Sequence, residues 1–133
     1  MKLKLKDLYQ RILKGKDDNR KISLLIKLAL KLHKKEPKKA LSIAKEALGV
    51  SNKINDKGGM AESLSVIGIC QRMLSEYENS INNLEESLKL YKELNNPEGQ
   101  ASINHHIGSV YMRKGEYRKA LDKFLESYGI CKK

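Results

Sequence analysis

A repeat of 40 residues constrains the fold of this chain more than any other feature of its sequence. The segments 35–37, 75–77 and 115–117 share a central Glu and stand 40 residues apart. Three further sets of similar residues keep the same interval: Ala40, Ser80 and Ala120; Ala44, Leu84 and Phe124; Ala47, Ser87 and Ser127. A fixed period of this length predicts supersecondary units that stack side by side.

Each copy of the repeat is predicted to contain two helices. Apolar residues recur with helical spacing on either side of a short polar break, as at Leu64 and Ile67 before it and Ile81 and Leu84 after it. Pro37 and Pro97 suit the first turn of a helix, and Asp56 and Asn95-Asn96 precede such turns as capping residues do. The pattern predicts helices at 3–14, 19–34, 37–53, 58–74, 77–94, 97–114 and 117–131.

Two glycines inside predicted helices indicate close helix contacts. Gly68 and Gly108 are equivalent in the repeat, and a helical glycine costs about 1 kcal/mol relative to alanine. A glycine repeated at one position therefore points to packing, where a larger side chain would push two antiparallel helices apart. The equivalent residue of the first copy is Leu28, so we expect the first helix pair to pack differently.

The residues at these spacings resemble the tetratricopeptide repeat (TPR) family. The last copy matches the family pattern best, the middle copy has Gln71 for the usual aromatic residue and Ser80 for Ala, and the first copy is degenerate. The TPR unit has about 34 residues, so the longer period is similar to a long form of the repeat. The matching residues are Ile107-Gly108, Tyr111, 115–117, Ala120-Leu121 and Phe124 in the last copy, Leu64, Ile67-Gly68, Tyr77 and Leu84 in the middle copy, and Pro37, Ala40, Ala44 and Ala47 in the first.

The resemblance implies an all-α fold, a right-handed α-solenoid of three helix hairpins preceded by one N-terminal helix. It covers about 21–133 and implies one domain with an N-terminal capping helix at 1–16 and repeats at 19–56, 57–96 and 97–133. The first helix of each hairpin would line a concave groove. Such stacks bind peptide segments or partner helices and seldom perform chemistry.

The resemblance also implies which residues line the groove. The first repeat contributes apolar residues, and the last contributes polar ones with Arg and His. An amphipathic helix or an extended segment with apolar and acidic residues would complement such a groove. The implied groove residues are Leu25, Ala29, Leu32 and His33; Glu62, Ser65, Ile69, Arg72 and Met73; and Ser102, His105, Ser109, Met112 and Arg113.

Arg72 and Arg113 are the expected anchors, because a guanidinium pairs bidentately with a carboxylate. The alternative is that both are ordinary solvated arginines. A TPR clamp for C-terminal carboxylates uses Lys, Asn and Arg at fixed groove positions, and this chain lacks that set. The positions hold Leu25, Ala29, Val66, Ser102 and His106 instead.

No catalytic residue, metal ligand or cofactor is predicted. His105 and His106 are neighbours that diverge by about 100° on a helix and cannot chelate one ion together; one is expected to face the groove and the other to pack against the adjacent helix. The chain has no phosphate-binding loop, HExxH motif or nucleophile elbow. Cys70 and Cys131 lie far apart without metal-ligand spacing, and we expect reduced thiols in a cytoplasmic protein.

The net charge of +11 belongs to one part of the chain. Residues 1–60 contain 17 Lys and Arg against six Asp and Glu, whereas 61–133 contain ten of each. An anionic partner, such as nucleic acid or a membrane surface, is one interpretation. A solvated lysine-rich face is the other, and the scarcity of aromatic residues and arginine there argues against specific nucleic-acid binding. No segment is apolar enough to span a membrane.

The predicted last helix would expose Leu121, Leu125 and Tyr128 at its outer face. We expect either that the chain is a fragment of a longer protein or that this face forms a homodimer or binds a partner. The leading hypothesis is a non-enzymatic adaptor that binds a protein or peptide. The alternative is an N-terminal sensory or regulatory region of a larger signalling protein, such as a cyclase, kinase or transcription regulator.

Overall fold

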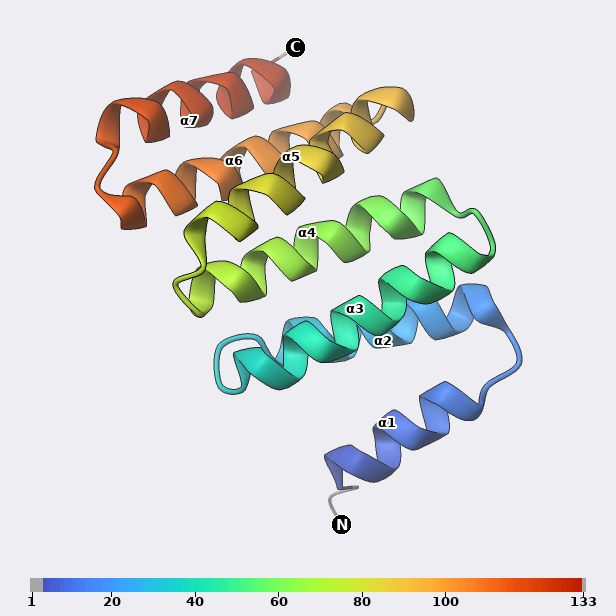
Figure 1. The fold of residues 1–133 in the computed structure, drawn as a ribbon. Coiled ribbons are helices and arrows are strands. Elements are labelled where there is room, and N and C mark those ends of the chain that lie inside the picture. The colour runs from blue at the N-terminus through green and yellow to red at the C-terminus, as the bar shows by residue number, and fades with distance from the viewer. Residues whose placement is uncertain (1–3, 133) are drawn as a thin grey trace.

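The computed structural model describes residues 4–132, and side chains for 4–130, as seven helices stacked in chain order (Figure 1). No strand occurs within 4–132, which confirms the all-α solenoid. The start of the first predicted helix, at residue 3, lies outside the described residues. The helices are α1 (Leu5–Lys14), α2 (Asp18–Leu32), α3 (Pro37–Lys53), α4 (Lys57–Met73), α5 (Tyr77–Glu93), α6 (Pro97–Lys114) and α7 (Tyr117–Lys132).

The helices from α3 onward begin at intervals of 20 residues, half the length of the sequence repeat. Each of the four junctions between α3 and α7 has one residue in the left-handed region, with φ between 52° and 82°. At each junction this residue and the next donate their N–H groups back to the preceding helix, for example Asn55 to Asn52 and Asp56 to Ser51. These bonds form Schellman motifs, which stop a helix sharply. The left-handed residues are Asn55, Ser75, Asn95 and Gly115.

Side-chain caps begin α2, α4 and α6, the first helix of each hairpin. The caps are Asp17, Asp56 and Asn96, whose side-chain oxygens accept the N–H of the residue three positions on at 3.2, 3.0 and 2.9 Å. Each cap satisfies a backbone donor that has no partner within the helix. The capping role expected for Asp56 and for the Asn95-Asn96 pair is therefore correct, with Asn96 as the residue that caps.

The two helical glycines mark the closest contacts within the hairpins. A Cβ added to Gly68 would lie 2.5 Å from Cγ of Leu84, and one added to Gly108 would lie 2.6 Å from the ring of Phe124. Leu84 and Phe124 are themselves equivalent in the repeat. In the first hairpin the sizes are reversed, with Leu28 and Ala44 at these positions, both buried. The expectation that the first pair packs differently is thus correct.

Serine hydroxyls join the paired helices, and two of these bonds lie at equivalent places of the repeat. The hydroxyl of Ser87 donates to the carbonyl of Ala61 at 2.7 Å, and that of Ser127 donates to Ala101 at 2.8 Å. Ser80 donates to the carbonyl of Gly68 at 2.6 Å, beside the glycine contact. Each of these hydrogen bonds gives the hydroxyl a partner and holds the two helices of the hairpin in register.

The stack has two apolar clusters. One combines residues of α1, α2, α3 and α4, and the other lies between α5 and α6. Helix α1 is the least embedded, with Ile12 buried and Leu8 39% exposed, and it lies at the opposite end of the stack from α7 (Figure 1). None of the helices in 4–132 is both long and apolar enough to cross a membrane.

Candidate partner-binding surface

The first helices of the three hairpins form one layer of the stack. Helix α4 contacts both α2 and α6, while α3, α5 and α7 pack on them as their hairpin partners. We call the outer surface of this layer the α2–α4–α6 face. The sequence predicted the partner-binding groove on these three helices.

Three residues assigned to the groove lie in the core instead. Leu25 and Ala29 are 0% exposed and Ile69 is 6% exposed, so their assignment as partner contacts is wrong. Leu25 and Ala29 belong to the apolar cluster that joins α2 to α3 and α4. A first helix is covered by its hairpin partner and by the next hairpin, and only a narrow stripe of it remains accessible.

The other assigned residues keep surface on the α2–α4–α6 face. Leu32 and His33 stand at the end of α2 and are partly buried. The remaining nine are exposed or partly buried: Glu62, Ser65, Arg72, Met73, Ser102, His105, Ser109, Met112 and Arg113.

The C-terminal ends of α4 and α6 enclose an open pocket of about 340 Å³. Its charged wall is formed by Arg72 of α4 and Arg113 of α6, and Phe124 of α7 forms an apolar wall. We call it the arginine pocket. The other lining residues are His105, His106, Ser109 and Met112.

The two arginines of this pocket interact electrostatically and have no ion-pair partner among the described residues. Burial, and then the positive charge of Arg113, lower the pKa of Arg72. Nε of Arg72 is buried and has no hydrogen-bond partner among the described residues. Arg113 contacts Met73, its equivalent in the preceding repeat, with 3.8 Å between Nη2 and Sδ. Within the described part of the chain, neither arginine forms an ion pair.

The two adjacent histidines have different surroundings. His106 is largely buried, and burial together with the charges of Arg72, His105 and His33 lowers its pKa to about 4. Its Nδ1 has no partner among the described residues. His105 is exposed, with its ring 5.4 Å from the ring of Phe124 in α7. At neutral pH His106 is therefore an uncharged imidazole near the guanidinium group of Arg72.

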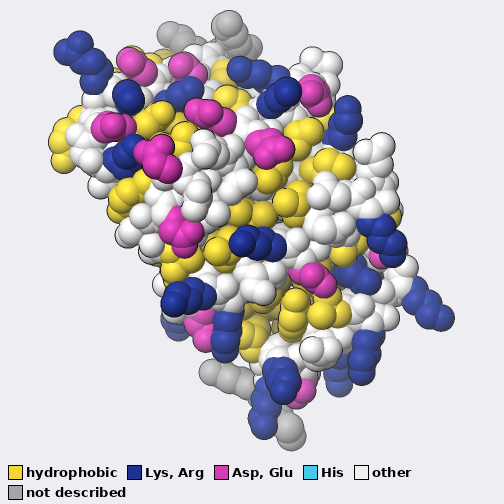
Figure 2. Space-filling view, in the orientation of Figure 1, with side chains coloured by type: hydrophobic (Ala, Val, Ile, Leu, Met, Phe, Trp, Pro, Cys, Tyr) yellow, Lys and Arg dark blue, Asp and Glu magenta, His cyan; other side chains and the backbone are white. Residues whose placement is uncertain are grey.

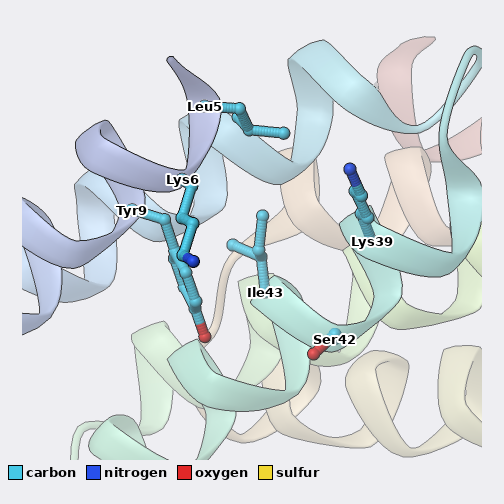
Figure 3. Close-up of a pocket in the computed structure, with 6 residues that line it drawn as sticks. All are labelled: Leu5, Lys6, Tyr9, Lys39, Ser42 and Ile43. Carbon is cyan, nitrogen blue, oxygen red and sulfur yellow. The ribbon is translucent and has the colours of Figure 1, made fainter. Parts of the chain in front are cut away.

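A second pocket, which sequence reasoning missed, lies between α1 and α3 (Figure 3). Leu5 and Tyr9 of α1 stand one helical turn apart and face Ile43 of α3, with Lys6 and Lys39 at the rim. Its volume is about 320 Å³, and Ser42 completes the lining. The spacing of Leu5 and Tyr9 was the available signal, although nothing in it indicates where α3 lies.

Charge and exposed apolar residues divide along the stack. Dark blue Lys and Arg side chains dominate the end formed by α1–α3, while both signs mix toward α5–α7 (Figure 2). At that other end, α7 exposes Leu121 and Leu125, each 56% accessible, and Tyr128, as the sequence predicted. The side chain of Cys131 lies outside the described residues; Cys70 is a free, buried thiol.

Comparison with known proteins identifies the fold. No protein-family model and no curated protein matches the sequence. The structure is similar to the crystal structure of the TPR domain of Arabidopsis FLU, with a TM-score of 0.77 and 17% sequence identity. The match covers 86% of this chain and 98% of that one. The helical stack that this chain shares with that domain is therefore the TPR fold.

Proposed function

Because this chain has the fold of a tetratricopeptide repeat domain, we propose that it is a protein-interaction module. It binds a segment of a partner protein on the α2–α4–α6 face and acts as an adaptor without catalytic activity. The observation that carries the proposal is the arginine pocket, which is lined by arginines of two consecutive repeats that form no ion pair within the described chain.

The face favours a segment with apolar and acidic side chains. Leu32, Met73 and Met112 supply apolar surface, and Arg72 and Arg113 supply positive charge. Because Leu25, Ala29 and Ile69 are buried, the apolar contribution is narrower than the sequence alone suggests. The partner segment is therefore expected to be held by charge and shape at the α6 end more than by a continuous apolar groove.

The proposal is tested by selecting peptides from a random 12-residue display library on the full chain. A blocking variant, Ser65→Arg, adds a long side chain in the middle of the face, and Asn82→Arg adds the same side chain on exposed α5 as a matched control. Selected peptides should lose binding to Ser65→Arg and keep it with Asn82→Arg. Equal binding to both variants would place the binding surface elsewhere, and the proposal would fail.

The outer face of α7 supports a second role, self-association. Leu121 and Leu125 stand four residues apart on one helix face and are both more than half exposed, an arrangement typical of helices that pair. We propose that two copies associate through this face. Light scattering across a concentration series should show a dimer that Leu125→Glu dissociates, while Lys119→Glu, an exposed change on the same helix, leaves it intact. A monomer at all concentrations would refute this role.

A further inference from the structure

The repeat brings together two positive charges that nothing in the described chain neutralises. Arg72 and Met73 of α4 are equivalent to Met112 and Arg113 of α6, so the last two repeats each carry one arginine and one methionine, in opposite order. The reversal places the arginines close enough for Arg113 to lower the pKa of Arg72. Arg72 is partly buried and Arg113 is exposed, and two like charges this close repel one another and destabilise the fold.

Two buried polar atoms in the same pocket also lack partners. They are Nε of Arg72 and Nδ1 of His106, and neither has a hydrogen bond within the described residues. Most buried polar atoms of folded proteins have a partner, so these two exceptions are unmet hydrogen-bonding groups on residues that line the pocket. Nε of Arg72 can only donate, and Nδ1 of a neutral histidine donates in one of its tautomers. The matching ligand group is an acceptor.

An anion matches the positive charge of both arginines and the donor character of Nε of Arg72. A carboxylate or phosphate supplies several acceptor oxygens and neutralises the repulsion between the arginines. Met112 and the ring of Phe124 line the other side of the pocket, which suits the short apolar arm that carries such a group in a peptide.

We propose that the arginine pocket is an anion subsite, which binds one oxygen-rich anionic side chain of the partner segment between Arg72 and Arg113. This inference rests on the proposed function, and it adds a requirement at one place: the bound segment must present a carboxylate or a phosphorylated side chain to the α6 end of the face.

Small capped amino acids test the subsite directly on the full chain. N-acetyl-glutamate methylamide and N-acetyl-phosphoserine methylamide represent the two sources of the anion, and N-acetyl-glutamine methylamide is the neutral match. The readout is the Nε–Hε resonance of Arg72 in nitrogen-15 spectra. Either anionic probe should shift this resonance in a saturable way. The probe that binds with the lower dissociation constant identifies whether the anion is a carboxylate or a phosphorylated side chain. The glutamine probe should leave it unchanged.

Three variants separate recognition from general attraction to a basic protein. Arg113→Gln should weaken binding of the anionic probe about tenfold or more, the loss expected for one charge-assisted pair. Arg72→Lys, which keeps the charge and loses the planar fork, should also weaken it. Arg118→Gln, an exposed change on α7, should have no effect. Equal loss in Arg113→Gln and Arg118→Gln, or no shift with any probe, would overturn the inference.

The same peptide selection distinguishes this inference from the proposed function. If peptides bind the α2–α4–α6 face but carry no excess of acidic or phosphorylated residues, and Arg113→Gln binds them unchanged, the subsite is wrong and the module remains. If the anionic probes bind but no peptide is selected, the subsite stands and the proposed module is wrong.

Discussion

Replacing Gly68 by alanine tests the packing of the second hairpin. The added Cβ would lie 2.5 Å from Cγ and 2.6 Å from Cδ2 of Leu84, and 3.3 Å from the carbonyl oxygen of Ser80. Carbon atoms pack best at about 3.5–4.0 Å, so α4 and α5 must separate or the fully buried Leu84 must move. The hydrogen bond from Ser80 to the Gly68 carbonyl resists that separation.

The magnitude is the difference between two opposing effects. Overpacking of a buried contact costs about 1–3 kcal/mol, whereas removing a helical glycine gains about 1 kcal/mol. We therefore expect Gly68→Ala to lower the free energy of unfolding by about 1 kcal/mol. Gly49→Ala is the matched control, because Gly49 lies exposed inside α3 with nothing within 4 Å of an added Cβ. That variant should gain up to about 1 kcal/mol.

Urea unfolding followed by circular dichroism at 222 nm measures both variants. The two free energies of unfolding should differ by about 2 kcal/mol, and the melting temperatures by about 8 °C in a chain of this size. A Gly68→Ala variant that is stabilised as much as Gly49→Ala would refute the reasoning. The same experiment in a Leu84→Ala background identifies the cause, because Gly68→Ala should then be stabilising. A penalty that persists there would implicate the Ser80 carbonyl instead.

Three further predictions follow from single residues. Ser75 has a φ of 62°, so Ser75→Gly should raise the free energy of unfolding by about 0.5–1 kcal/mol, whereas Ser42→Gly inside α3 should lower it. The pKa of His106 is about 4 in the folded protein and about 6.5 in the unfolded chain. Between these two pH values the unfolded state binds more protons, so the free energy of unfolding decreases as the pH drops from 6.5 toward 4. At pH 5 this loss is about 2 kcal/mol, and urea titrations should show a smaller pH dependence in His106→Asn. Burial raises the pKa of Cys70 to about 11, so in a Cys131→Ser variant the thiol should react with Ellman's reagent at pH 8 only as fast as the protein unfolds.

Helix positions could be predicted from the sequence because the determinants are local. Apolar spacing, Pro37 and Pro97 at first turns, and the capping residues act within a few positions of each helix end. The starts of the helices from α3 onward agree with prediction to within one residue. The close glycine contacts were predictable for a different reason. Glycine destabilises a helix, so its recurrence at Gly68 and Gly108 indicates that close packing requires it there.

Surface exposure was less predictable because it depends on helices distant in sequence. Leu25 and Ala29 occupy helix positions that line a groove by family analogy, yet α3 and α4 cover them completely. The pocket beside Tyr9 depends in the same way on where α3 lies relative to α1. The arginine pocket was half predicted: the sequence singled out Arg72 and Arg113, while the partial burial of His106 in the same pocket required the structure.

At the contact where Gly68 and Gly108 lie, the first hairpin has the large residue on its first helix and the other two have it on their second. This difference limits how the helices of such a chain can be recombined. A small residue faces a large one in every hairpin, but α2 carries the large partner and α4 and α6 carry the small one. Transplanting α4 in front of α3 would set Gly68 against Ala44 and leave a void, and transplanting α2 in front of α5 would set Leu28 against Leu84. Moving the first hairpin as a whole keeps Leu28 with Ala44, so at this contact the hairpin, rather than the single helix, is the unit of design.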